Sequence, residues 1–140
     1  YDDDFSWCVG SQAWADAFDP TTRRVPEYAI LLDMVGARDA RFHREYFSDR
    51  YARNVNNLVW DAARRAGYGD RFPDAPGGAL NDDHIHIMRV GIPAVDIVES
   101  ANPSTGSFNP TWHTLDDNLD NIDPATLKMV ADVVINTIFK

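Results

Sequence analysis

The chain has 140 residues, 44% of them hydrophobic, and its 22 acidic against 13 basic residues give a net charge of −9. This length and apolar content predict one folded domain and exclude wholesale disorder, while the acidic balance argues against a nucleic-acid or anionic-membrane binder, which would need a basic face. No apolar run approaches the roughly 18 residues of a membrane span, and the single cysteine, Cys8, excludes an internal disulfide framework and a zinc site built from cysteines.

A short helix and a buried strand are predicted early in the chain. The helix covers residues 10–18, where Ala13, Trp14 and Phe18 share one apolar face before an Asp-Pro-Thr-Thr sequence ends it. Residues 28–35 (YAILLDMV) are apolar except for one aspartate near the end. Such a run is typical of a strand that is buried on both faces, as in a parallel sheet.

A long helix is predicted over residues 49–66, with Ser48 as its N-cap and Gly67 as its C-terminal stop. Apolar residues recur along it at helical spacing and define the face that packs against the core. This face consists of Tyr51, Val55, Leu58, Val59, Ala62 and Ala66.

The second half of the chain predicts a short helix, a second strand and a last helix. The short helix covers residues 82–89 and is closed by Gly91, and residues 92–98 (IPAVDIV) form the strand. The last helix has Asp123 as its N-cap and Pro124 at its first position. Its apolar stripe consists of Leu127, Val130, Val134 and Ile138.

Strands that alternate with helices predict an α/β fold with a parallel sheet. Two strands are too few for a stable sheet of this kind, which usually has about five or six. Either further strands lie around Phe42 and Phe72, or the chain is part of a larger domain.

Three segments carry polar groups that suit chemistry. Asp33 ends the first predicted strand, where α/β folds place ligand sites, and the alternative is a solvent-facing or loop-capping aspartate. Residues 81–84 (NDDH) contain adjacent carboxylates, which need solvent, a cation or a shared proton, and the alternative is a helix cap with a solvated neighbour. Residues 108–117 (FNPTWHTLDD) place His113 in an aromatic loop, either as a metal ligand or as a packed loop histidine.

Taken in order, these segments resemble the zinc-dependent glutaminyl cyclases and the zinc aminopeptidases of the same fold. The matching stretches are LLDMVGA (31–37), NDDHIHIMRVGIPAVDIV (81–98) and WHTLDDNLDNID (112–123), together with the Gly10-Ser11 pair. The resemblance covers nearly the whole chain and is nearest to the bacterial members. It implies a three-layer α/β/α fold with a mixed, mostly parallel sheet.

The resemblance also implies roles for individual residues. His113 would ligate zinc, the implied cofactor. Asp33 would be the strand-end acid, which is a second zinc ligand in the aminopeptidases and a substrate-facing group in the cyclases, and Asp82 would join it in a catalytic carboxylate network. The residues expected to contact the substrate are Asn81, Phe108 and Trp112. Asp96 stands where animal cyclases carry histidine, so that part of their network cannot be transferred.

One feature of the family is not found in this sequence. Family members also hold zinc through an aspartate and a glutamate of an upstream D-x-E stretch, beside which another glutamate moves the proton. Asp2, Asp3 and Asp4 match the loop after that stretch and not the stretch itself. We therefore expect residues 1–140 to be the C-terminal half of a single zinc-dependent catalytic domain, without its N-terminal strands. Because one histidine with distant aspartates is a poor zinc site, we expect this half alone to be inactive.

The leading functional hypothesis is zinc-assisted cyclisation of N-terminal glutamine to pyroglutamate, with release of ammonia. Trp112 and the doubled Asp82-Asp83 favour it over a di-zinc aminopeptidase, and a metal-free binding domain on the same scaffold is the second alternative. The expected partners are a peptide or protein with N-terminal glutamine, and the missing half of the domain or a second chain that covers the sheet. Neither nucleic acid nor a membrane span is expected. By resemblance alone the protein is periplasmic, secreted or lipid-anchored, although the chain shows no targeting signal.

Overall fold

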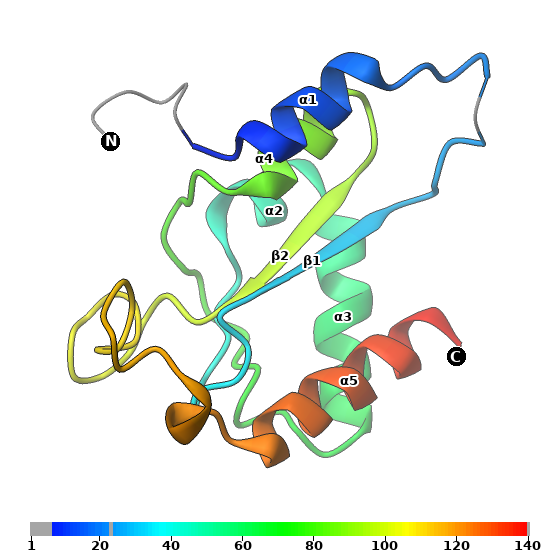
Figure 1. Ribbon diagram of the computed structural model, residues 1–140. Coiled ribbons are helices and arrows are strands. Elements are labelled where there is room, and N and C mark those ends of the chain that lie inside the picture. The colour runs from blue at the N-terminus through cyan, green and yellow to red at the C-terminus, as the bar shows by residue number, and fades with distance from the viewer. Residues whose placement is uncertain (1–6, 23, 140) are drawn as a thin grey trace.

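The computed structural model describes residues 7–22 and 24–139 (Figure 1). The elements along the chain are helix α1 (Val9–Ala17), strand β1 (Ala29–Asp33), helices α2 (Tyr46–Tyr51), α3 (Arg53–Arg65) and α4 (Asp83–Arg89), strand β2 (Ala94–Val98), the short 3₁₀ helix η2 (Leu119–Asn121) and helix α5 (Pro124–Ile138). Within the described ranges, no helix has both the length and the apolar character that crossing a bilayer requires.

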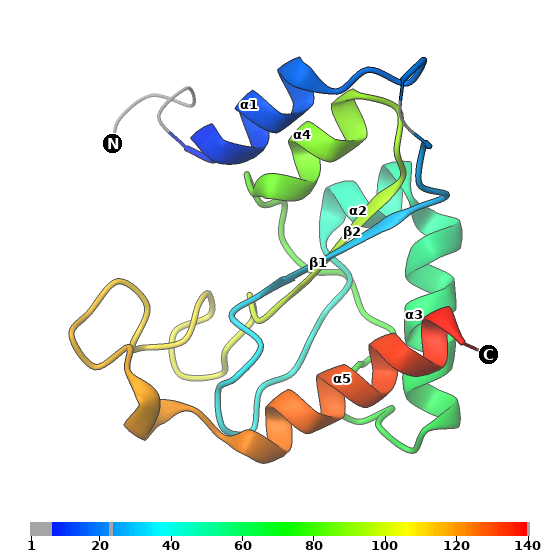
Figure 2. The same cartoon turned by 45° about the vertical axis from the view of Figure 1, so that its right-hand side comes forward.

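The two strands form a parallel pair, as the alternation of strands and helices predicts. Ala29 pairs with Ala94, and the register runs on to Asp33 opposite Val98. Helices α4 and α1 lie over one face of the pair, and α3 and α5 lie over the other (Figure 2). The α/β class and its helix–sheet–helix layering are therefore confirmed. A mixed sheet also contains antiparallel strands, and none is found among the described strands.

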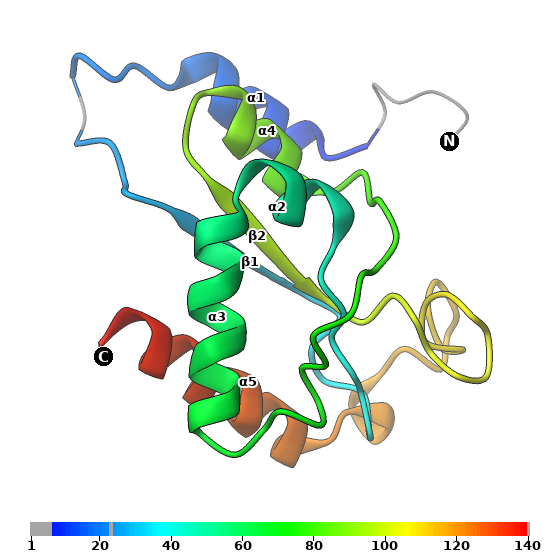
Figure 3. The same cartoon turned by 180° about the vertical axis from the view of Figure 1, so that it is seen from behind.

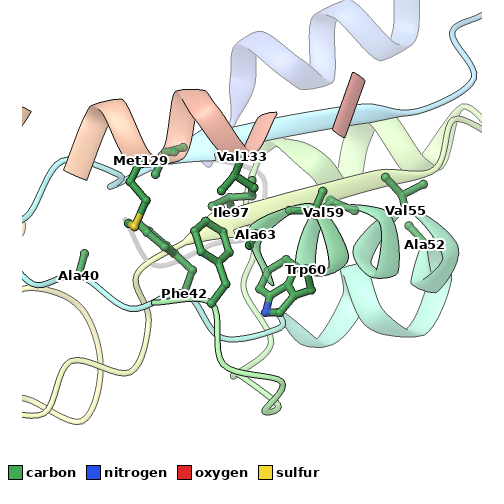
Figure 4. Packing of buried hydrophobic residues seen from close by; sticks show 13 residues of the cluster. Ala40, Phe42, Ala52, Val55, Val59, Trp60, Ala63, Ile97, Met129 and Val133 are labelled. Carbon is green, nitrogen blue, oxygen red and sulfur yellow. The ribbon is translucent and has the colours of Figure 1, made fainter. Parts of the chain in front are cut away.

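The hydrophobic core lies between the sheet and the helices α3 and α5. Val59 of α3 and Val133 of α5 pack around Ile97 of β2 (Figure 4). Successive side chains of a strand point to opposite faces. Val95 and Ile97 therefore face this core, and Asp96 between them faces α4. Seen from behind, α3 runs along the sheet over this face (Figure 3).

The segments around Phe42 and Phe72 are not strands, so that part of the prediction is wrong. Both are loop residues whose buried rings lie 5.0 Å apart and complete the core. Trp60 packs its ring edge-on to Phe72 and donates its indole N–H to the carbonyl of Pro73 at 3.0 Å. Aromatic packing holds these loops in place, together with backbone hydrogen bonds such as that from the Phe42 N–H to the Arg71 carbonyl at 2.8 Å and an isolated parallel bridge between Arg44 and Pro76, but no strand forms.

The prediction of burial on both faces is correct for β2 and wrong for β1. Every residue of β2 is buried, whereas Leu32 of β1 is 45% exposed. No further strand pairs with the free edge of β1 within the described ranges. The two apolar runs predicted both strands. They did not show that the described elements would cover both faces of β2 and leave part of β1 exposed.

The predicted helix over 49–66 is two helices. Ala52 leaves the helical conformation with φ −135°, which separates α2 from α3. Glu45, and not Ser48, caps α2, because its carboxylate accepts hydrogen bonds from the N–H groups of Phe47 and Ser48. The helix therefore begins earlier than predicted, and Tyr51, expected on the apolar face, is 64% exposed.

Helix α5 begins as predicted but buries a different face. Asp123 accepts a hydrogen bond from the Ala125 N–H and Pro124 is the first helical residue. The buried residues are Thr126, Met129, Val130, Val133 and Thr137, whereas Leu127 and Ile138 are exposed. Threonine can lie in this interface because its hydroxyl donates to a backbone carbonyl, from Thr126 to Ala37 and from Thr137 to Val133.

The apolar face predicted for the first helix is also exposed in large part. Ala15 is the buried residue of α1, while Trp14 is 39% exposed and its ring rests on Phe18. The predicted helix over 82–89 is confirmed as α4, which begins after Asp82 and is followed by Gly91 at φ 88°.

Gly36, directly after β1, permits a close contact that any side chain would disturb. A Cβ at Gly36 would lie 2.9 Å from Ile122 Cδ1 and 3.3 Å from Leu127 Cδ2. We expect Gly36→Ala to lower the free energy of unfolding by about 1 kcal/mol, the lower end of the cost of overpacking, because the side-chain ends of Ile122 and Leu127 can shift; urea denaturation measures the change. Gly69→Ala is the control, because a Cβ there meets nothing within 4 Å. Equal stability of the two variants would contradict this account.

Candidate functional site

A pocket of about 500 Å³ lies where β1 ends. Its walls come from Asp33 at the strand end, from the segment that leads into α4, from the loop that follows β2 and from the start of α1. The lining residues are Trp7, Cys8, Asp33, Met34, Leu80, Asn81, Asp82, Phe108, Trp112, His113 and Asp117. All the site residues predicted from the sequence therefore meet in one pocket, although they come from three separate segments.

Asp33 and Asp82 form the carboxylate pair of the pocket. Asp33 is the last residue of β1, and Asp82 is the N-cap of α4, where it accepts a hydrogen bond from the Asp83 N–H at 2.8 Å. Burial, followed by the hydrogen bond and negative charge of Asp82, raises the pKa of Asp33 to about 6, although a backbone hydrogen bond from Met34 acts against this rise. The pair can therefore exchange a proton with a ligand near neutral pH.

His113 lies among aromatic rings at the edge of the pocket. Its ring stacks on Trp112, with centroids 3.9 Å apart and planes 18° apart, and on Trp7, at 6.2 Å and 14°. Phe108 packs against Trp112 at 4.7 Å. The backbone of His113 is left-handed, with φ 57°. The aromatic wall that the sequence predicted from Phe108 and Trp112 is thus extended by Trp7, which sequence reasoning did not include.

Cys8 also lines the pocket without having been predicted to do so. Its thiol and the carboxylates of Asp82 and Asp83 have potential ligand atoms within 4.8 Å of one another. Burial, together with the carboxylates of Asp83 and Asp82, raises the pKa of the thiol to about 12, so Cys8 keeps its proton and donates to Asp83. A protonated thiol is a poor metal ligand, and we read this group as a hydrogen-bonded contact between α1 and α4.

The described residues do not complete a zinc site around His113. Zinc usually takes three protein ligands and one open position. In the described part of the chain, the group of three ligand-type side chains that converges is the one at Cys8, and His113 is not a member of it. His113 therefore offers zinc a single imidazole ligand from this chain.

Behind the pocket lies a buried polar group that sequence reasoning missed. Asp96, His84 and Glu45 are each 0% exposed. Burial, together with the charges of Asp82, Asp33 and Glu45, raises the pKa of Asp96 to about 9. The available signal was a lone carboxylate in an otherwise apolar strand, which costs too much free energy to be buried without a compensating partner.

A larger groove of about 1060 Å³ lies between α1, α2 and α4. Its lining is mainly apolar, including Phe47, Ile85 and Met88, with an ion pair between Arg89 and Asp16 at 3.0 Å. It lacks a cluster of carboxylates with shifted pKa values. We therefore assign the candidate functional site to the smaller pocket, at the strand ends where α/β folds bind ligands.

The fold and this pocket define an α/β protein with a carboxylate-rich site at the end of a parallel strand. Residues 4–138 match the model of peptidase family M28, and the chain belongs to that family.

Relatives of known structure or function support this membership. The glutaminyl-peptide cyclotransferase of Bos taurus is 39% identical over 108 residues, which cover 70% of this chain and 28% of that protein. The glutaminyl cyclase of Bacteroides thetaiotaomicron, solved with N-acetylhistamine, is 41% identical with a TM-score of 0.91, over 100% of this chain and 47% of its own. A Zn-dependent exopeptidase from Parabacteroides distasonis is 42% identical with a TM-score of 0.87, over 96% and 46%. The chain thus spans about half of these solved structures and less than a third of the bovine relative.

The raised pKa of Asp96 predicts how stability depends on pH. The folded state keeps the Asp96 proton up to about pH 9, whereas the unfolded chain releases it near its ordinary value of 3.8. Between these values the unfolded state binds fewer protons, so stability falls as pH rises. We expect Asp96→Asn, which cannot ionise, to unfold at higher urea concentration relative to wild type at pH 8 than at pH 5.

The exposed Asp70→Asn provides the control for this comparison. Parallel stability–pH curves for wild type and Asp96→Asn would show that Asp96 is not protonated in the folded state.

Proposed function

We propose that the full-length protein is a glutaminyl-peptide cyclotransferase, which converts N-terminal glutamine to pyroglutamate and releases ammonia. The main support is the convergence of Asp33, Asp82 and His113 with an aromatic wall in one pocket. The cyclases among the similar proteins add support, and this chain would supply the C-terminal half of the catalytic domain.

In this reaction the α-amine of the substrate attacks the γ-carbonyl carbon of its own side chain. A C–N bond forms in the new ring, the bond to the amide nitrogen breaks, and the amine proton leaves with ammonia. Asp33 and Asp82 are placed to accept hydrogen bonds from the α-amine and from the leaving nitrogen, and so to hold the two nitrogens in line. Asn81 and Phe108 would contact the glutamine side chain, while Trp112 forms the wall that excludes water.

Zinc is the proposed cofactor, with His113 as its ligand in this chain. When bound, zinc would polarise the γ-carbonyl as a Lewis acid. The stacking of the imidazole between Trp112 and Trp7 fits a ligand whose ring plane must be fixed. The remaining ligands would come from the part of the domain that this chain does not span.

The second candidate is a di-zinc aminopeptidase, in which Asp33 ligates a second metal. A family of peptidases and a Zn-dependent exopeptidase among the similar structures favour it. Trp112 before His113 and the doubled Asp82-Asp83 favour the cyclase. A metal-free binding domain is the third candidate.

The first test is incubation of the zinc-loaded full-length protein with a peptide that begins with glutamine, followed by mass spectrometry. We expect the peptide to lose one ammonia and otherwise to stay intact. Release of the first residue would establish the aminopeptidase instead, and an unchanged peptide would leave the binding domain. The same glutamine peptide incubated without the protein controls for spontaneous cyclisation.

The second test is His113→Ala in the full-length protein. Because changes of groups that merely orient ligands cost about 10–100-fold, we expect loss of the ligand itself to lower turnover at least about 100-fold and to abolish tight zinc binding. Zinc is measured per chain by atomic emission, and one equivalent in wild type supports the cyclase while two support the peptidase. His43→Ala, outside the pocket, is the control. Unchanged zinc content in His113→Ala would refute the ligand assignment.

A further inference from the structure

The loop that carries the aromatic wall of the pocket begins directly after β2. Residues 99–118 connect this strand to η2 without a helix or strand of their own, and they extend away from the sheet (Figure 1). Phe108, Trp112 and His113 lie on this loop and line the pocket. A loop without regular backbone pairing is held in place by specific contacts, so the position of the wall depends on which contacts the loop makes.

Asn102 closes the first part of the loop into a turn. Its N–H donates to the Ser107 carbonyl at 2.8 Å, and its own carbonyl accepts from the Gly106 N–H at 2.7 Å. The hydroxyl of Thr105 then donates to the carbonyl of Phe108, which follows directly on the turn. The place of the Phe108 backbone is therefore set by the place of the turn.

Glu99 joins this turn to the end of the sheet. It is the first residue after β2 and is 2% exposed, and its Oε1 accepts a hydrogen bond from Asn102 Nδ2 at 2.7 Å. With the described residues, the other hydrogen bonds of residues 102–118 all stay within residues 102–121. The bond to Glu99 is thus the polar link between the turn and the body of the protein.

Packing alone does not explain a glutamate at this position. Its second oxygen, Oε2, is buried and has no hydrogen-bond partner among the described residues. An apolar side chain of similar size would fill the space without leaving a buried oxygen unpaired, which costs free energy. The two residues before it, Ile97 and Val98, are apolar and fully buried. What glutamate adds over an apolar residue is the acceptor for Asn102.

We propose that Glu99 is a positioning residue for the reaction proposed above, on which this inference rests: its hydrogen bond to Asn102 fixes the turn of residues 102–107 at the end of β2 and so places Phe108 in the wall that binds the glutamine side chain. Glu99 does not line the pocket and acts through Asn102. Because it shapes the binding wall and does not reach the reacting atoms, the KM depends on it more than the kcat does.

A swap of donor and acceptor in the full-length protein tests this role. Asn102→Asp keeps the shape and the oxygen that accepts from the Ser104 N–H, but it loses the donor to Glu99. We expect it to raise the KM for a glutamine peptide about 10-fold, the range for one lost buried hydrogen bond, with a smaller change in kcat. Adding Glu99→Gln supplies a donor from the other side, and we expect this double variant to return to within about 2-fold of the wild-type KM.

The matched control is Asn136→Asp, the same substitution at an exposed asparagine of α5 whose side chain donates to the carbonyl of Asp132. We expect it to leave the KM unchanged. A purely structural role for Glu99 predicts that the two changes add, so that the double variant is at least as impaired as Asn102→Asp. That result, or an unchanged KM in Asn102→Asp, would overturn the proposal.

Hydrogen–deuterium exchange gives a readout that does not depend on turnover. We expect the N–H groups of Gly106 and Ser107 to exchange about 10-fold faster in Asn102→Asp and to recover in the double variant, while α3 keeps its wild-type rates. Equal acceleration in α3 would mean general destabilisation, and would overturn the proposal.

The two proposals fail in different ways. A wild type that leaves glutamine peptides unchanged refutes the cyclase function, while the exchange rates still support or overturn the link between Glu99 and the turn. A wild type that releases ammonia, with no recovery in the double variant, refutes only the positioning role.

Discussion

The arrangement of the pocket depends on a buried carboxylate that does not line it. Glu45 accepts hydrogen bonds from Phe47 and Ser48, which start α2, and from the backbone of Leu80, which leads into α4. Its bond to His84 then fixes α4 itself. An ion can be stable in the interior when its hydrogen bonds are complete, and each of these donors would be unpaired without it. The loop, α2 and α4 therefore keep fixed positions relative to one another.

The two faces of the sheet have different tasks. On one face, Val95 and Ile97 belong to the apolar core that the sheet forms with α3 and α5. On the other, Asp96 and Asp33 face the start of α4, where Asp82 lies. Because side chains alternate along a strand, one short sequence serves both tasks. Changes on the polar face can therefore alter the site while the apolar face keeps the fold.

Local signals in the sequence were enough to predict both strands, α4, and the start of α5 at Asp123. The resemblance brought the pocket residues together, because the family motifs stand at the ends of these elements. The sequence did not predict what depends on distant contacts. Glu45 is held at the start of α2 by Leu80 and His84 from far along the chain, and Thr126 is buried because its hydroxyl donates to the distant carbonyl of Ala37. The raised pKa of Asp96 likewise depends on neighbours from three other segments.

The left-handed backbone of His113 has a consequence for ligand affinity. Residues with a Cβ seldom adopt this conformation, and histidine is among those that tolerate it. At φ 57°, the ring stacks on Trp112 at 3.9 Å and on Trp7 at 6.2 Å before anything binds. The rotational entropy of the imidazole is thus lost when the chain folds and not when a ligand arrives. A partner of His113 meets a preorganised group, and its dissociation constant is lowered by the ordering that folding has already done.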